Sequence, residues 1–476
     1  MASTIQTQDQ VSLKLLVNKD TNKVLFAEAG KDFVDVLFSF LTLPLGTIAR
    51  LVEKKSNMGS VSVGCLNKLY QSVRDLDIEC LRSLKNKEML LQPTNASQNY
   101  CSSLKLNIDD TEPAKYFLCT KLNGCTSSCY MNLSRNKKCG CDSLYTRSVS
   151  LKHFHKGFVN DSTSFVVTDN LFVMPNSVHY TGLSLLQALG VKSATSVKEL
   201  IVNVTKETVL DMLKCSLLSK TPLSDLFLRQ KPSLESYKFF PCDLEKECNI
   251  QIKVKLVIRK SDGKVVYAQA EQDFADLLLS FLSFPLGAVV RVLGGICSIA
   301  NIDCLYKSVV DLVESKYFVS EKAKNRLVDP PLAPVFKYSQ KIFPVENPRV
   351  GYYCFYQDEN YKQSINCNRF FLTDEYRSEW GKYEKLEVES PTGYVKGPRA
   401  YMATDDLVLT PWSQISALHL INNLEIPLHD LKEKLVTIGI KDCLNILKAS
   451  LISTSALTNG LCHLLTEVKE EILKMN

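Results

Sequence analysis

The sequence contains the same pattern of residues twice, and this repetition limits how the chain can fold more than any other feature. Residues 11–52 align without gaps on residues 252–293, and 18 of the 42 aligned positions are identical. Three shorter blocks recur in the same order: residues 69–76 and 305–312, 168–171 and 404–407, and 213–217 and 447–451. The period exceeds 200 residues, which excludes a solenoid of short repeats. We therefore expect two homologous units, at residues 11–230 and 251–470, joined by a polar linker at 231–250.

Each unit opens with a pattern that predicts a β-hairpin followed by a helix. Apolar runs at 13–17 and 24–27 flank a polar turn, and the second unit has Asp262-Gly263 in the matching turn, a strong hairpin signal. Residues 33–41 then place their large apolar side chains on one helical face. We expect Asp32, or Asp273 in the second unit, to cap the start of this helix.

The residues around this helix lead to two more expectations. Asp35 and its counterpart Asp276 fall on the face opposite the apolar one, where we expect solvent. Pro44 and Gly46 are residue types that end helices, so the helix should stop before them.

Later parts of each unit mix short strands with helices. Strand pairs are expected at 165–174 and 401–410, helices near 177–190, 206–219, 413–424 and 440–453, and loops at 85–115 and 313–350. Strands and helices do not alternate as in βαβ units, so the predicted class is α+β.

Composition excludes several classes of protein. Apolar residues make up 45% of the chain and charged residues 23%, which is ordinary for a globular protein. The net charge of +6 is too small for this length to indicate nucleic acid or anionic lipid as a partner. Uncharged stretches at 36–49 and 277–290 are shorter than the roughly 20 residues of a membrane span, so we expect buried helices and no membrane association. The polar N-terminus does not resemble a signal peptide, so we expect an intracellular location, in the cytoplasm, the nucleus or both.

Cysteines are abundant, with 17 in the chain, and an intracellular location favours reduced thiols. Cys125 and Cys129 have the spacing of a chelating turn, and Gly140 between Cys139 and Cys141 gives a second turn the backbone freedom it needs. The sequence therefore predicts one structural zinc ion bound by Cys125, Cys129, Cys139 and Cys141, with Cys119 as the alternative ligand and His153 or His155 as substitutes. The other interpretation is a group of reduced cysteines without metal. In its favour, the second unit keeps only Cys354 and Cys367 in the corresponding stretch.

Motifs for familiar enzyme chemistry are absent from the sequence: there is no Gly-x-Gly-x-x-Gly, Walker loop, His-Glu-x-x-His or Gly-x-Ser-x-Gly. We therefore expect a non-enzymatic interaction or regulatory module with a protein partner. Two alternatives stay open. One is a zinc-dependent nucleic-acid-binding protein, in which the basic aromatic segment 152–158 stacks on bases. The other is an enzyme of unrecognised chemistry built on recurrent acidic and basic residues: Asp32/Asp273, Asp35/Asp276, Arg50/Arg291 and Asp169/Asp405.

The repeated blocks resemble a plant family of unknown function, DUF674. The similarity rests on residues 14–17, 24–29, 32–37 and 40–46, on the Leu69-Tyr70-x-Ser72-Val73 block and on residues 168–171. It covers nearly the whole chain in two tandem copies and implies a plant protein with an intracellular location, but no activity. Members of this family usually have a Cys pair followed by Cys-Pro-x-Cys. The corresponding residues of this chain are Lys138-Cys139-Gly140-Cys141.

Overall fold

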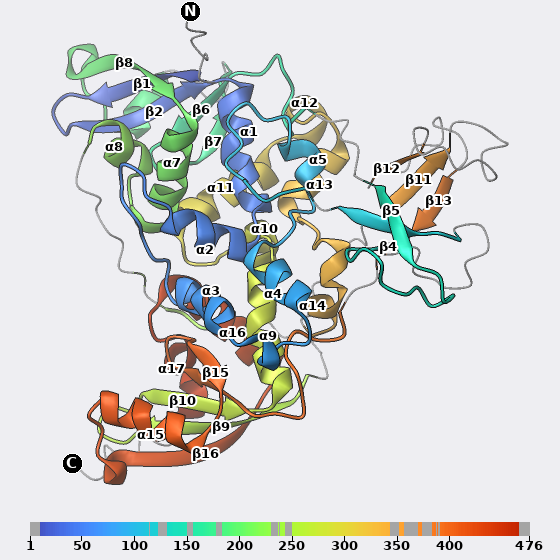
Figure 1. Ribbon diagram of the computed structural model, residues 1–476. Coiled ribbons are helices and arrows are strands. Elements are labelled where there is room, and N and C mark those ends of the chain that lie inside the picture. Colours follow the sequence, from blue (N-terminus) through green and yellow to red (C-terminus); the bar gives the residue numbers. More distant parts are fainter. Residues whose placement is uncertain are drawn as a thin grey trace, which may run out of the picture.

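The computed structural model of the chain is shown in Figure 1. It describes residues 10–113, 115–121, 131–149, 156–177, 183–229, 237, 239–242, 250–342, 352–356, 370–373, 383–386, 388 and 391–465. Most of the predicted linker at 231–250 lies outside these residues.

Two five-stranded antiparallel sheets with the same strand order lie at opposite ends of the main body (Figure 1). The first has the order β7-β6-β2-β1-β8 and the second the order β15-β14-β10-β9-β16. Their strands are β1 (Val11–Asn18), β2 (Lys23–Ala29), β6 (Phe165–Thr168), β7 (Val173–Pro175), β8 (Val197–Val204), β9 (Ile252–Arg259), β10 (Val265–Ala270), β14 (Tyr401–Thr404), β15 (Leu409–Pro411) and β16 (Leu431–Ile438). The predicted hairpins and later strand pairs are confirmed.

Two three-stranded sheets, β4-β3-β5 and β12-β11-β13, lie to one side of the body (Figure 1). Their strands are β3 (Tyr116–Cys119), β4 (Met131–Asn132), β5 (Tyr145–Val149), β11 (Tyr352–Tyr356), β12 (Phe370–Thr373) and β13 (Tyr383–Leu386).

The helices lie mostly between the two large sheets and confirm the predicted α+β class. They are α1 (Lys31–Ser39), α2 (Leu45–Glu53), α3 (Leu66–Asp75), α4 (Leu84–Leu91), α5 (Gln98–Cys101), α6 (Leu183–Ala188), α7 (Lys206–Leu218), α8 (Pro222–Phe227), α9 (Gln272–Ser280), α10 (Leu286–Val292), α11 (Ala300–Asp311), α12 (Glu314–Tyr317), α13 (Glu321–Val328), α14 (Lys337–Ile342), α15 (Gln414–Asn423), α16 (Ile440–Ile452) and α17 (Ala456–Gly460). The expectation of loops at 85–115 and 313–350 is wrong, because α4 and α13 lie there, each begun by a serine N-cap (Ser83 or Ser320).

Helix α1 stops before Pro44 as predicted, but its N-cap and the role of Gly46 differ from the prediction. Its N-cap is Gly30, and Asp32 lies in the first turn, where a carboxylate still interacts favourably with the helix dipole. The helix ends at Ser39, and Pro44 is the N-cap of the next helix, α2. Gly46 lies inside α2 and does not terminate a helix. In the second half Glu271 is the N-cap of α9, with Asp273 in the first turn.

A glycine is needed at position 46 because backbone of both halves of the chain approaches it closely. A β-carbon there would lie 3.0 Å from the carbonyl oxygen of Leu90 and 3.1 Å from that of Leu282. Its counterpart Gly287 has the same kind of neighbours, with Leu41 of the first half at 3.0 Å. The repeated Pro-Leu-Gly therefore lets the two halves come into backbone contact.

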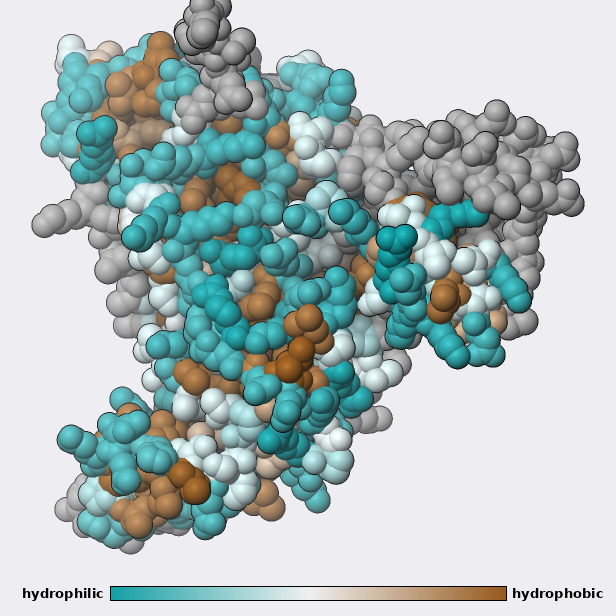
Figure 2. Space-filling model, in the orientation of Figure 1, coloured by the Kyte–Doolittle hydropathy of each residue, from teal (hydrophilic) through white to brown (hydrophobic). Residues whose placement is uncertain are grey.

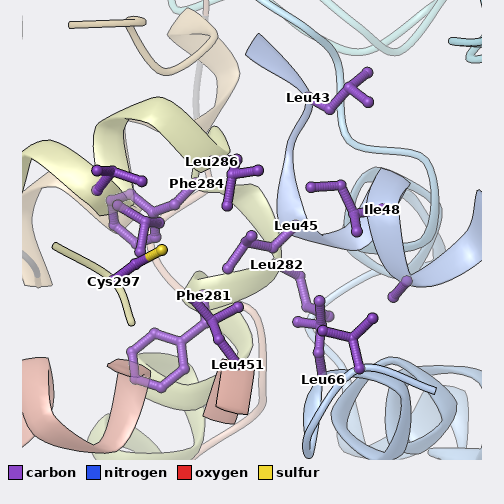
Figure 3. Close-up of a cluster of buried hydrophobic side chains, with 14 of the residues drawn as sticks. Leu43, Leu45, Ile48, Leu66, Phe281, Leu282, Phe284, Leu286, Cys297 and Leu451 are labelled. Atoms are coloured by element: carbon purple, nitrogen blue, oxygen red, sulfur yellow. The ribbon is translucent and has the colours of Figure 1, made fainter. Parts of the chain in front are cut away.

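Reciprocal hydrogen bonds join the two halves at this contact. The Leu45 N–H donates to the Phe284 carbonyl (2.9 Å), and the Leu286 N–H donates to the Leu43 carbonyl (3.0 Å). Figure 3 shows side chains of both halves packed together around this point, among them Ile48, Leu66 and Phe281. One hydrophobic core runs from Val11 to Leu465 through both halves.

Each half also sends a helix to the sheet of the other half. Ser72 on α3 accepts a hydrogen bond from the Leu409 N–H at the start of β15 (2.9 Å). Ser308 on α11 accepts the matching bond from the Val173 N–H of β7 (2.8 Å). The edge strands β7 and β15 therefore take part of their hydrogen bonding from the opposite half.

The surface in Figure 2 is mainly hydrophilic, with brown apolar residues at the end that holds α15 and β16. Exposed apolar residues there are Ile415, Leu418, Leu424, Leu428 and Leu435. The two uncharged stretches at 36–49 and 277–290 are buried. Among the described residues, no helix has the length and apolar character needed to cross a membrane.

Candidate metal centre

The cysteine-rich segment forms the β4-β3-β5 sheet and the turn between β4 and β5. We call its described residues, 116–121 and 131–149, the cysteine lobe. Strand β3 is central, and its register with β5 shifts between Leu118 and Cys119. Cys119, Cys139 and Tyr145 form a small buried cluster of their own, with Phe117 and Cys141 packed against it. The lobe therefore has little apolar core of its own, which is typical of segments that need a disulfide or a metal to be stable.

A tight turn brings Cys139 and Cys141 together. The Cys139 N–H donates to the Ser143 carbonyl (2.7 Å), and the Asp142 N–H donates to the Cys139 carbonyl (2.9 Å). The left-handed backbone conformation falls on Asp142, with φ 61°.

Three sulfur atoms meet at one end of the lobe. The Sγ atoms of Cys119, Cys139 and Cys141 all lie within 4.8 Å of one another, and those of Cys119 and Cys141 are 3.5 Å apart. Four thiolates around zinc, with Zn–S bonds of about 2.3 Å, have sulfurs about 3.8 Å apart. A disulfide would need about 2.05 Å. The spacing therefore suits a shared tetrahedral metal ion.

Burial also fits a structural metal site. Cys119 and Cys139 are 2% and 4% exposed, and Cys141 is partly exposed. A thiolate cluster closed to solvent on most sides is the pattern of structural rather than catalytic zinc, which keeps an open position for water.

The structure covers part of the predicted ligand set. It brings Cys139 and Cys141 together with Cys119, the residue predicted as the alternative ligand. Cys125 and Cys129 lie outside the described residues, as do His153 and His155. In the β12-β11-β13 sheet of the second half, Cys354 lies on the central strand, and Cys367 lies outside the described residues.

Residues 7–441 match the family described as "Protein of unknown function (DUF674)". The chain belongs to this family. The match confirms the resemblance inferred from the repeated blocks, and it extends from before β1 into the first turn of α16. No curated protein matches the chain, and no solved structure matches it.

In this DUF674 chain the recurrent aspartates of the two halves hold backbone segments in place. The prediction that Asp35 and Asp276 face solvent is wrong, because both are fully buried. Oδ1 of Asp35 accepts hydrogen bonds from the N–H groups of Phe158 (2.8 Å) and Val159 (2.9 Å). Oδ1 of Asp276 accepts the equivalent pair from Tyr394 and Val395. Burial raises the pKa of both carboxyls, that of Asp35 to about 6.

A recurring tripeptide in the sequence is a signal for this arrangement. Gly157-Phe158-Val159 and Gly393-Tyr394-Val395 recur at the same 236-residue shift as two of the other blocks. A recurring Gly-aromatic-Val indicates a backbone turn that both halves need.

The other recurrent polar residues also have partners of their own. Asp169 accepts hydrogen bonds from the N–H and hydroxyl of Ser224 at the start of α8, and Asp405 does the same with Thr458. Arg50 pairs with Asp110, and Arg291 pairs with Asp329. These contacts anchor loops and helix ends, and they do not bring the recurrent acids and bases together at one site.

One of the two phenylalanines expected to stack on nucleobases, Phe158, is part of the core. Phe158 is fully buried and stacks on Tyr100, with ring centroids 5.2 Å apart. Residues 152–155 of the same basic segment, including Phe154, lie outside the described residues. Phe158 therefore cannot serve as a base-stacking platform.

Proposed function

We propose that the protein is a non-enzymatic interaction or regulatory module whose cysteine lobe is stabilised by one structural zinc ion. The observation that carries the proposal is the convergence of Cys119, Cys139 and Cys141 within 4.8 Å. Cys125 and Cys129, which follow β3 in the sequence, are the candidates for the fourth thiolate. Zinc bound in this way would hold the end of β3 and the turn before β5 together.

The role of such a lobe would be to present a fixed surface to a partner. Small zinc-braced lobes carry loops whose shape depends on the metal rather than on a large core. The proposal requires reduced thiols, so it places the protein in an intracellular compartment, with a protein as its partner. Plant origin is part of the same proposal and follows from the family resemblance.

Metal content is the direct test. The full chain would be purified without chelator, and zinc would be measured by atomic spectroscopy beside a Cys139→Ser/Cys141→Ser double variant. We expect about one zinc per chain in the wild type and much less in the variant. Cys462→Ser is the matched control, because Cys462 is also partly exposed but lies far from the lobe in the C-terminal segment.

A second measurement keeps the test valid if the double variant folds poorly. Hydrogen exchange of β3 and β5 would be followed in wild-type protein before and after a chelator is added. Faster exchange in these strands, with no change in β9 and β10, supports the proposal. Absence of zinc in the wild-type protein, or exchange that chelation leaves unchanged, contradicts it.

A further inference from the structure

A polar cavity of about 250 Å³ lies where the cysteine lobe meets the main body. The body contributes residues 82–89 around the start of α4, the lobe contributes the loop after β4, and the second half contributes residues 391–393. The volume is below the roughly 300–1,000 Å³ of pockets for drug-sized ligands, so the cavity suits a small ligand.

The charged residues that line this cavity are all cationic: Arg82, Lys85 and Lys137. No aspartate or glutamate is among the described residues that line it. Ser83, Ser134 and Asn132 add polar side chains. A lining of cations and hydroxyl donors is the chemistry that recognises an oxyanion.

Arg82 is the cation that the fold holds most firmly. Its Nε donates to the Val395 carbonyl (3.0 Å), and it lies against Gly393, where a β-carbon would be 2.7 Å from that Nε. Within the described part of the chain, neither terminal nitrogen of Arg82 has a hydrogen-bond partner. One edge of the guanidinium is therefore fixed, and its terminal N–H groups stay available to a ligand.

Among the described residues, two carboxylates near Arg82 and Lys85 reduce the positive charge of the cavity. Glu88 pairs with Lys85 (3.1 Å) on the exposed side of α4. Asp276 is buried behind Gly393. Burial raises the pKa of its carboxyl more than the nearby Arg82 lowers it. Lys137 belongs to a loop that also carries Arg135 and Lys138, both exposed. Residues 135–138 of this loop therefore carry positive charges only.

We propose that this cavity binds a phosphate-class oxyanion, either free phosphate or the phosphate group of a small molecule. The anion would lie between the terminal N–H groups of Arg82 and the ammonium of Lys137, so it would bridge the body and the lobe. The hydroxyl of Ser134 can donate to a further oxygen of a tetrahedral anion, whereas that of Ser83 already donates to Oδ1 of Asn86 (3.0 Å).

The position of the cavity also couples it to the metal centre. The loop that carries Lys137 runs directly into Cys139, and its start is fixed by the Ser134 N–H donating to Oδ1 of Asn132 on β4 (2.7 Å). Zinc bound at the lobe would hold the loop from its other end. This coupling rests on the proposed function, whereas the binding of an anion by the cavity does not.

Isothermal titration calorimetry on the full, zinc-replete chain tests the proposal. The probes are inorganic phosphate, pyrophosphate and glycerol phosphate, with chloride of the same ionic strength as the blank. We expect saturable binding of at least one phosphate probe, weakened about tenfold or more by Arg82→Gln. Lys137→Gln is the second variant, because this exposed residue leaves the Arg82–Val395 contact intact. The control is Lys198→Gln/Lys206→Gln, two exposed cations near β8.

The outcomes separate the two proposals. The anion site is supported if both cavity variants weaken phosphate binding and the control variant does not. The probe that binds most tightly then shows whether the natural ligand is free phosphate or a phosphomonoester. No saturable binding, or equal weakening by the control, overturns it. If the wild type contains no zinc but binds phosphate through Arg82, the metal proposal fails and the anion site stands. If zinc is present, its removal should weaken phosphate binding severalfold.

Discussion

Gly157 lies against the buried carboxylate of Asp35 so closely that a β-carbon on Gly157 would overlap Oδ2 of Asp35. The backbone at Gly157 has φ 85°, a conformation that L-residues rarely adopt. This turn directs the N–H groups of Phe158 and Val159 to the carboxylate. The segment then reaches the other half of the chain, where the Val319 N–H donates to the Phe158 carbonyl (2.9 Å). The Asp35–Gly157 contact therefore helps to hold the two halves together.

The substitution Gly157→Ala tests this relationship. We expect it to destabilise the protein by about 3 kcal/mol or more, because it adds the cost of a left-handed alanine and displaces a carboxylate that satisfies two buried N–H groups. Thermal unfolding monitored by circular dichroism would measure the loss. Gly190→Ala is the matched control: Gly190 has φ 76°, but a β-carbon there would have nothing within 4 Å. It should cost only about 1–2 kcal/mol, and equal losses in the two variants would contradict the role given to Asp35.

Asp35 also predicts a dependence of stability on pH. Burial raises its pKa to about 6 in the folded protein, above the about 3.9 of aspartate in an unfolded chain. Between these values the folded state keeps a proton that the unfolded state has released. The contribution of Asp35 to the free energy of unfolding therefore falls as the pH rises from about 4 to about 6, and it is constant above that. The decrease is of the order of 3 kcal/mol.

The variant Asp35→Asn isolates this effect, because it keeps Oδ1 as an acceptor and removes the titration. Urea unfolding of both proteins would be compared at pH values from about 4 to 7. We expect the wild type to lose stability relative to the variant over the lower part of this range. Asp161→Asn is the control, since Asp161 also lies near Lys31 but its side chain is 92% exposed. Parallel pH profiles for wild type and Asp35→Asn would rule out the predicted titration.

The serines that connect each helix to the opposite sheet give a third prediction. Ser72→Ala leaves the buried N–H of Leu409 without its acceptor, and Ser308→Ala does the same to Val173. Each substitution should cost about 1–3 kcal/mol. Hydrogen exchange should quicken at Leu409 in the first variant and at Val173 in the second, and threonine at either position should restore much of the protection. Slower exchange of these amides in either alanine variant would refute the assignment.

The ligand set of the metal centre can be ranked by single serine substitutions. If Cys119 is a ligand rather than a bystander, Cys119→Ser should weaken zinc retention as much as Cys139→Ser does, because each removes one thiolate from the cluster. If either Cys125 or Cys129 supplies the fourth thiolate, the variants Cys125→Ser and Cys129→Ser should differ in zinc retention. Competition with a chromophoric chelator would measure retention. Full retention in Cys119→Ser would remove Cys119 from the site.

Local patterns predicted local structure well, because the hairpins, the later strand pairs and the long helices each follow from periodicity and turn residues. The helices α4 and α13 were not predicted, because neither has a strongly apolar face in its short sequence and each is stabilised by tertiary packing. Asp35 was misjudged for a related reason. Its position on α1 does face away from the apolar stripe, but that side is covered by a segment more than 120 residues later in the chain.

In the metal centre, too, the features that depend on local spacing could be predicted and those that depend on tertiary pairing could not. Spacing identified Cys139 and Cys141 as a pair, since a short turn determines their separation. The closeness of Cys119 depends on the pairing of β3 with β5, which no pattern within the cysteine segment encodes. The anion cavity could not be predicted at all, because its lining comes from the first half, the lobe and residues 391–393.

The reciprocal contacts between the halves lead to the last prediction. The units predicted at 11–230 and 251–470 share one core, exchange the hydrogen bonds of Leu45 and Leu286, and place Gly46 and Gly287 against each other's backbone. A separate half would expose much of this apolar surface, so each should be poorly folded or aggregated when expressed alone. Co-expression of the two halves as separate chains should instead yield a soluble one-to-one complex, visible by size-exclusion chromatography with light scattering. Gly46→Val in the first half should weaken that complex, since its side chain would displace the backbone at Leu90 and Leu282. Two halves that fold independently as stable monomers would show that the shared core is not required.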